Sequence, residues 1–159
     1  MRRVIAIASG GGHWVQLMRL RPAWDGQALT YVTTVAGYEA EVRRDALARG
    51  QAVPRFFTVT DANLKERKLH LLRQLLQVAW IVLTTRPHAV VSTGASLGYF
   101  ALRLGRLIGA RTIWIDSIAN AEELSLSGRK IGRHADVWLT QWPELADEGR
   151  GLHYEGSVL

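Results

Sequence analysis

The sequence contains no cysteine among its 159 residues, which excludes both a disulfide framework and a thiolate metal site. Long hydrophobic runs are also missing. The apolar run at residues 4–8 is followed directly by Ser9 and three glycines, which makes it too short for the core of a signal peptide. The longest other run, residues 78–83, is far below the roughly 20 residues that cross a bilayer. We therefore expect no segment that spans a membrane.

Familiar cofactor and metal motifs are absent as well. The glycine turn at residues 9–13 departs from G-x-G-x-x-G, because Val15 stands three positions after Gly12, and it lacks the lysine of a P-loop. No Asp-x-Asp pair is present that could bind a metal ion beside a nucleotide. We therefore expect a protein that works without a metal ion or an organic cofactor.

Basic residues outnumber acidic ones, 20 to 14, and give a formal net charge of +6. This excess favours an anionic neighbour, which could be nucleic acid, acidic lipid or a phosphorylated substrate. The densest basic cluster opens the most hydrophobic predicted helix and consists of Lys65, Arg67, Lys68, His70 and Arg73. A basic start on an apolar helix is typical of a site that contacts lipid, so the pattern favours a membrane surface over nucleic acid.

Short β-rich segments alternate with helical segments along the whole chain. We predict strands at residues 3–8, 29–35, 55–59, 88–92, 111–116 and 136–140, and a last short strand or linker at 153–159. We predict helices at about 14–24, 39–48, 63–85 and 119–124, and one from the turn at 93–98 to residue 107. Several strands are apolar at nearly every position, which indicates a parallel sheet covered on both faces. The expected fold is a single doubly wound, Rossmann-like α/β domain over residues 1–159.

Three segments follow predicted strands directly: residues 9–13, 92–96 and 116–120. In a sheet of this kind ligands bind beyond the carboxyl ends of the strands, so these segments share one candidate site. The two glycine turns have backbone that can approach an anion closely, and each precedes a helix N-terminus. We predict that they bind a diphosphate through Gly10, Gly11, Gly12, Thr93, Gly94 and Ser96. A tight turn without a ligand remains the alternative for each of them.

Two side chains at this predicted edge are candidates for acid–base chemistry. His13 stands where a general base or a donor to phosphate would lie, and Asp116 is the one carboxylate at the end of a predicted strand. Structural alternatives exist for both, because His13 could cap its helix and Asp116 could cap a helix beginning near Ala119.

The predicted helix at 63–85 is apolar on almost every side in its second half. Leu72, Leu75, Leu76, Ala79 and Leu83 follow the spacing of a core-facing stripe. Leu71, Val78, Trp80 and Ile81 then remain outside that stripe. With the basic residues Lys65, Arg67, Lys68 and Arg73, we predict that they contact a bilayer surface.

Residues 114–132, 135–136 and 140–145 resemble a known family of glycosyltransferase subunits. The most specific pieces are Leu124-Ser-Leu-Ser-Gly128 and Gln141-Trp-Pro-Glu-Leu145. They resemble the acceptor-binding, membrane-recruiting subunit of the eukaryotic two-subunit transferase that adds the second N-acetylglucosamine to a dolichol-diphosphate sugar. They also resemble its bacterial counterparts in exopolysaccharide clusters. Both glycine turns fall where these proteins carry glycine loops, so the resemblance covers almost the whole chain.

The resemblance implies the N-terminal half of a GT-B fold that is split over two polypeptides. The separate donor-binding subunit would bind the nucleotide sugar and would contact this chain beyond Thr140, at Gln141, Trp142, Pro143 and Glu144. The acceptor would be a polyprenyl-diphosphate-linked saccharide at the cytoplasmic face of the membrane. Eukaryotic relatives have an N-terminal transmembrane helix and a Glu-Ser pair where this chain has Asp116-Ser117. Attachment to the membrane is therefore expected to be peripheral.

Two other functions fit parts of the sequence. A non-catalytic scaffold could recruit the donor-binding subunit to the membrane. A dinucleotide-binding oxidoreductase would need an acidic residue after the second strand to bind ribose, and the sequence offers Thr33-Thr34-Val35-Ala36 there.

Overall fold

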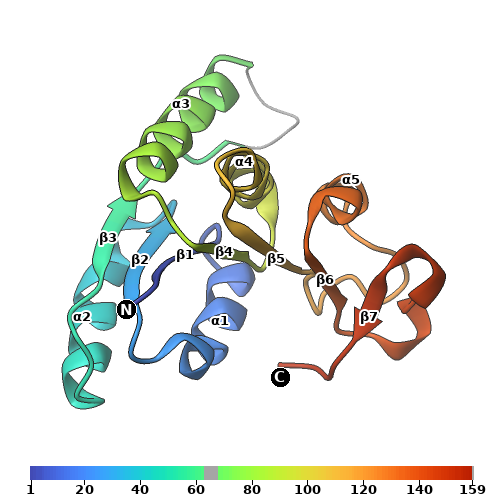
Figure 1. Ribbon diagram of the computed structural model, residues 1–159, viewed down its shortest axis with the longest axis horizontal. Helices are drawn as coiled ribbons and strands as arrows, with labels where there is room; N and C mark the ends of the chain where they lie inside the picture. Colours follow the sequence, from blue (N-terminus) through green and yellow to red (C-terminus); the bar gives the residue numbers. More distant parts are fainter. Residues whose placement is uncertain (63–67, 159) are drawn as a thin grey trace.

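The computed structural model describes residues 1–62 and 68–158. Lys65 and Arg67, two of the predicted membrane contacts, lie outside the described residues. Seven strands form one sheet, paired in parallel throughout, in the order β3-β2-β1-β4-β5-β6-β7 (Figure 1). The strands are β1 (Arg3–Ile7), β2 (Ala28–Thr33), β3 (Arg55–Thr58), β4 (Ala89–Ser92), β5 (Arg111–Ile115), β6 (Val137–Thr140) and β7 (Leu152–Tyr154). The predicted doubly wound α/β fold is confirmed.

Helices lie on both faces of this sheet (Figure 1). On one face are α1 (Gly12–Arg19) and α2 (Glu39–Ala48), and on the other are α3 (Lys68–Thr85), α4 (Ala95–Leu107) and α5 (Leu126–Ile131). Two buried clusters correspond to the two faces. Alternate β1 residues divide between them, with Ile5 and Ile7 facing α3 and α4, and Val4 and Ala6 facing α1. This alternation is the period of two that a strand imposes on its side chains.

The strand order reverses between β1 and β4. From β1 the chain proceeds outward to β2 and β3, and it then returns to β4 beside β1 and continues in the other direction. The chain leaves β1 and β4 toward opposite faces of the sheet, and in sheets of this type ligands bind in the crevice beyond the carboxyl ends of the strands at such a reversal.

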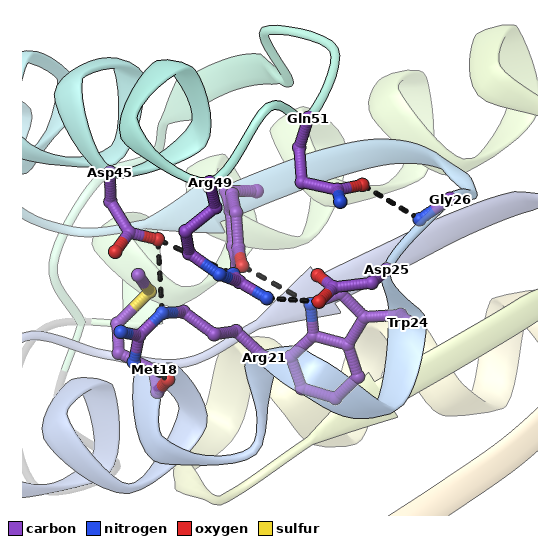
Figure 2. A network of polar contacts seen from close by, with 9 residues as sticks. Met18, Arg21, Trp24, Asp25, Gly26, Asp45, Arg49 and Gln51 are labelled. Atoms are coloured by element: carbon purple, nitrogen blue, oxygen red, sulfur yellow. Dashed lines mark hydrogen bonds and ion pairs between the residues drawn. The ribbon is translucent and has the colours of Figure 1, made fainter.

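The predicted helix at 14–24 is interrupted in the structure. It divides into α1 and a short 3-10 turn, Arg21–Trp24, because Pro22 cannot continue the α-helical hydrogen bonding. Ion pairs fasten this turn to α2 (Figure 2). Arg21 Nε lies 2.9 Å from Asp45 Oδ2, and Arg49 pairs with both Asp45 and Asp25. This network lies at the amino ends of the strands, which is the end opposite the crevice. It connects the segment after α1 to α2.

The prediction of a helix at 119–124 was wrong. The short helix α5 begins after Ser125, whose hydroxyl accepts a hydrogen bond from the Gly128 N–H at 2.8 Å. Residues 119–124 form an irregular loop instead. Asn120 and Ser125 at the two ends of this loop both bind the carboxylate of Asp116, and these contacts replace helical hydrogen bonds.

The predicted orientation of α3 was also wrong. Gln74, Val78, Ile81, Val82 and Thr85 face the core, so Val78 and Ile81 are not available to a membrane. The side chains that face solvent are Leu69, Leu72, Leu76, Trp80 and Leu83, with Leu71 half-buried and the basic residues Lys68 and Arg73 exposed. No helix in the described part of the chain is long and apolar enough to span a membrane.

Candidate functional site

The two glycine turns meet at the crevice between β1 and β4, joined by reciprocal hydrogen bonds. His13 Nδ1 lies 2.9 Å from the carbonyl oxygen of Thr93, and Thr93 Oγ1 donates to the carbonyl oxygen of His13 at 2.7 Å. The two residues are 80 positions apart in the sequence. The predicted convergence of residues 9–13 and 92–96 is therefore present in the structure.

The contact with Thr93 determines the tautomer of His13. A carbonyl oxygen can only accept, so Nδ1 must carry the hydrogen in this contact. In the neutral ring, Nε2 then holds the free lone pair, and the described residues provide it with no hydrogen-bond partner. The ring is half-buried and oriented by its other nitrogen, which is the arrangement that a general base requires.

Gly94 supports the His13 ring directly. A Cβ built at Gly94 would lie 2.4 Å from both Nδ1 and Cε1 of His13, and the residue has a φ of +142°, which L side chains rarely adopt. Ala95, the next residue, also has a positive φ, of 68°. Strained backbone of this kind is found where a turn must hold a defined shape at a functional site.

We expect Gly94→Ala to reduce transferase activity by about tenfold or more, because the new methyl group displaces the His13 ring from Thr93. Backbone strain should also lower the free energy of unfolding by about 1–3 kcal/mol. Gly109→Ala is the matched control, since Gly109 has a φ of +82° but open space around its Cβ position. Steady-state rates and thermal melts of both variants test this. Equal losses of activity in the two variants would exclude a specific role for the contact with His13.

Two backbone N–H groups of the first turn are already hydrogen-bonded to side chains from other segments. Gly10 N–H donates to Thr34 Oγ1 at 3.0 Å, and Gly11 N–H donates to the hydroxyl of Tyr38 at 3.2 Å. The amides that remain are those at the start of α1, from Gly12 onward, which have no acceptor within the helix. Of the three predicted glycines, Gly10 and Gly11 therefore have their N–H groups already bonded, and free donors for an anion begin at Gly12.

The hydroxyls of the second turn are likewise occupied. Thr93 donates to His13, and Ser96 donates to Gln74 Oε1 at 2.7 Å, with the carbonyl oxygen of Ala62 at 3.1 Å. Both side chains are buried. The hydroxyls that were predicted to bind phosphate thus fix the turn to its neighbours in this structure. The first amides of α4 remain as donors, next to those of α1.

Asp116 is buried beside this site and is already saturated with hydrogen bonds. Its Oδ1 accepts from Trp114 Nε1 at 3.0 Å and from the Ser125 hydroxyl at 2.6 Å. Its Oδ2 accepts from Asn120 Nδ2 at 3.1 Å and from the Ser125 N–H at 2.9 Å. The side chain is 1% exposed. Asp116 therefore organises the loop after β5, and in this arrangement it cannot take a proton from a substrate, contrary to the prediction.

The four residues predicted to contact a partner, 141–144, differ in how far they are exposed. Gln141 is buried, and its side chain bonds Gln16 Oε1 at 2.6 Å, the Asp116 carbonyl oxygen at 2.9 Å and the Val158 N–H at 2.9 Å. It therefore cannot contact a partner. Trp142 is half-buried, with its indole N–H donating to the Ile118 carbonyl oxygen at 2.8 Å. Pro143 and Glu144 are exposed.

Several residues that shape the site had no signal in the sequence. Thr34 and Tyr38 complete the first turn from 24 and 27 positions away, and Tyr38 stacks on Trp14 with ring centroids 5.1 Å apart. Gln16 reaches residues about a hundred positions away. Only the tertiary fold brings these pairs together, so no local pattern could have identified them.

The fold is that of one half of a GT-B protein. The whole chain superposes on 47% of the crystal structure of MurG from Acinetobacter baumannii, with a TM-score of 0.71 and 14% identity. It covers 45% of a UDP-N-acetylglucosamine 2-epimerase from Rickettsia bellii, with a TM-score of 0.64 and 15% identity over 99% of this chain. At these identities the likeness concerns the fold alone. The chain spans about half the length of both structures.

The family is shown by sequence. The model of the family described as "Oligosaccharide biosynthesis protein Alg14 like" matches residues 4–158, and the chain belongs to this family. It is 27% identical to the UDP-N-acetylglucosamine transferase subunit ALG14 of Eremothecium gossypii, over 99% of this chain and 80% of that protein. It is 38% identical to the ALG14 subunit of Yarrowia lipolytica, over 46% of this chain and 37% of that protein. The chain is a glycosyltransferase subunit.

Proposed function

We propose that this chain is the acceptor-binding subunit of a glycosyltransferase that acts in polysaccharide biosynthesis. The acceptor is a polyprenyl-diphosphate-linked saccharide, and a separate donor-binding subunit supplies the sugar from a nucleotide diphosphate sugar. The main support is the meeting of two helix N-termini at the strand reversal, with an oriented His13 between them. The first amides of α1 and α4 are donors suited to a diphosphate.

In the proposed reaction, Nε2 of His13 takes the proton from an acceptor hydroxyl. The resulting oxygen attacks the anomeric carbon of the donor sugar, and the bond from that carbon to the nucleotide diphosphate breaks, so the diphosphate departs with the bonding electrons. Thr93 orients the imidazole through the Nδ1 hydrogen bond. This chain supplies the base and the acceptor site, and its partner supplies the donor.

The exposed stripe on α3 supports peripheral attachment to a membrane, which we place at the cytoplasmic face. Five large apolar side chains lie along one side of this helix, namely Leu69, Leu72, Leu76, Trp80 and Leu83. Lys68 and Arg73 near its first turns are exposed and can meet anionic lipid headgroups. Such a stripe, with a basic end, fits an interface between water and lipid. Attachment through this stripe would place the site beside the acceptor, whose lipid tail remains in the membrane.

The test is transfer by the separated and reassembled subunits. The names of the relatives make UDP-N-acetylglucosamine the first donor to assay. The chain and its donor-binding partner should each be inactive alone, and their complex should extend a polyprenyl-diphosphate-linked saccharide in detergent or vesicles. Transfer by the isolated chain at the rate of the complex would refute the two-subunit assignment. A complex that binds the acceptor no better than the donor-binding subunit alone would refute the assignment of the acceptor site.

A further inference from the structure

The two faces of the sheet are unequally covered. On one face α3, α4 and α5 lie side by side over the central strands (Figure 1). On the other face lie α1 and α2, which follow β1 and β2, and no further α-helix of the described residues (Figure 1). Ile113 on β5 is only half-buried there. Central parallel strands are normally buried on both faces, so this surface lacks a cover.

An apolar groove occupies this surface. It has a volume of about 400 Å³, and its apolar walls include Val4, Leu20, Trp24, Val91, Ile113 and Ile115. These side chains come from three strands and from the segment after α1. The groove is large enough to accept several side chains of another polypeptide.

The edge of the groove at the amino ends of β1, β4 and β5 is basic. Arg2 and Arg111, which are both exposed, line it together with His88, and no carboxylate is among its lining residues. The nearby carboxylate of Asp136 is paired with Arg106, at 3.1 Å. A segment that enters this groove would therefore gain from acidic residues placed beside its apolar ones.

We propose that the groove binds an apolar segment of the donor-binding subunit, with acidic residues that meet Arg2 and Arg111. This inference rests on the proposed function for the identity of that partner. A second copy of this chain fits poorly, because a two-fold contact would pair two basic grooves that have no carboxylate among their lining residues. A bilayer is also disfavoured, since the groove opens on the face opposite α3. Membrane and partner can therefore be engaged at the same time.

The charges provide the first test. Isothermal titration of the purified donor-binding subunit into this chain should show at least tenfold weaker binding for the double variant Arg2→Glu, Arg111→Glu. The matched control is Arg43→Glu, Arg44→Glu on α2, which also reverses two exposed arginines and should stay within about threefold of wild type. Unchanged affinity in the groove variant, or equal losses in both, would overturn the proposal.

Cross-linking provides a second test that does not depend on weakened binding. A photoreactive benzoylphenylalanine at Ala23, which is exposed at the groove, should label the donor-binding subunit in the complex, and one at Ala48 on α2 should not. Cross-links from Ala23 to a second copy, or none to the partner, would contradict the proposal. If the complex assembles through the groove and transfers no sugar, the proposed function fails while this interface stands.

Discussion

Replacing His13 with glutamine is expected to lower kcat of the assembled transferase by roughly 10²–10⁴-fold, the usual contribution of a general base. Glutamine retains hydrogen-bonding capacity and similar size but cannot accept the proton from the acceptor hydroxyl. The KM for the acceptor should change little, because the amides of α1 and α4 remain in place. Initial rates at varied acceptor concentration separate these two effects.

The control for this variant is His153→Gln. His153 lies exposed on β7 at the far edge of the sheet, and its replacement should leave kcat unchanged. Complex assembly should be verified for both variants by size-exclusion chromatography. If the His13 variant assembles and retains full activity, the chain acts as a scaffold that recruits the donor-binding subunit, and the catalytic assignment is wrong.

Removing two leucines from the exposed stripe of α3 should have the second large effect. Leu72 and Leu76 are 51% and 62% exposed. Moving each from water into lipid contributes about 1.5 kcal/mol. Because about 1.4 kcal/mol changes an equilibrium tenfold, the double variant Leu72→Gln, Leu76→Gln should bind vesicles roughly 100-fold more weakly. Sedimentation with vesicles that contain anionic phosphatidylglycerol measures this partition.

The matched control is Leu47→Gln, Val53→Gln, which removes two exposed apolar side chains outside α3. It should retain the wild-type partition, and its thermal stability should match that of the α3 variant. Added salt should weaken wild-type binding further, because it screens Lys68 and Arg73 from the lipid charge. Equal losses in the two double variants would show that the stripe has no special role in membrane contact.

The orientation of α3 shows why a pattern of apolar residues was insufficient. The helix is apolar on nearly all sides, so two stripes could each have faced the core. The stripe that does so includes Gln74, which is completely buried. Its amide donates to the Thr60 carbonyl oxygen at 2.8 Å and accepts from the Ser96 hydroxyl. A buried polar group is tolerated when both of its functions are satisfied, and these partners come from distant segments.

Asp116 shows that the position of a residue in the sequence was likewise insufficient to predict its role at the candidate site. Its place after β5 was correctly predicted, and that position alone suited a catalytic carboxylate. The loop that follows then supplies Asn120 and Ser125 as hydrogen-bond donors, which converts the carboxylate into the anchor of an irregular segment. This also explains why no helix forms at 119–124.

The sequence by itself determined the strand–helix alternation, the doubly wound sheet and the two glycine turns after β1 and β4. These features depend on local chemistry: apolar β-rich segments, helix-compatible spacing and glycines with unusual backbone angles. Tertiary structure decided the rest, including which face of α3 is exposed, which amides of the turns remain free and which nitrogen of His13 carries hydrogen. Each of these is set by a hydrogen-bond partner or a packing surface that lies far away in the sequence and becomes a neighbour only on folding.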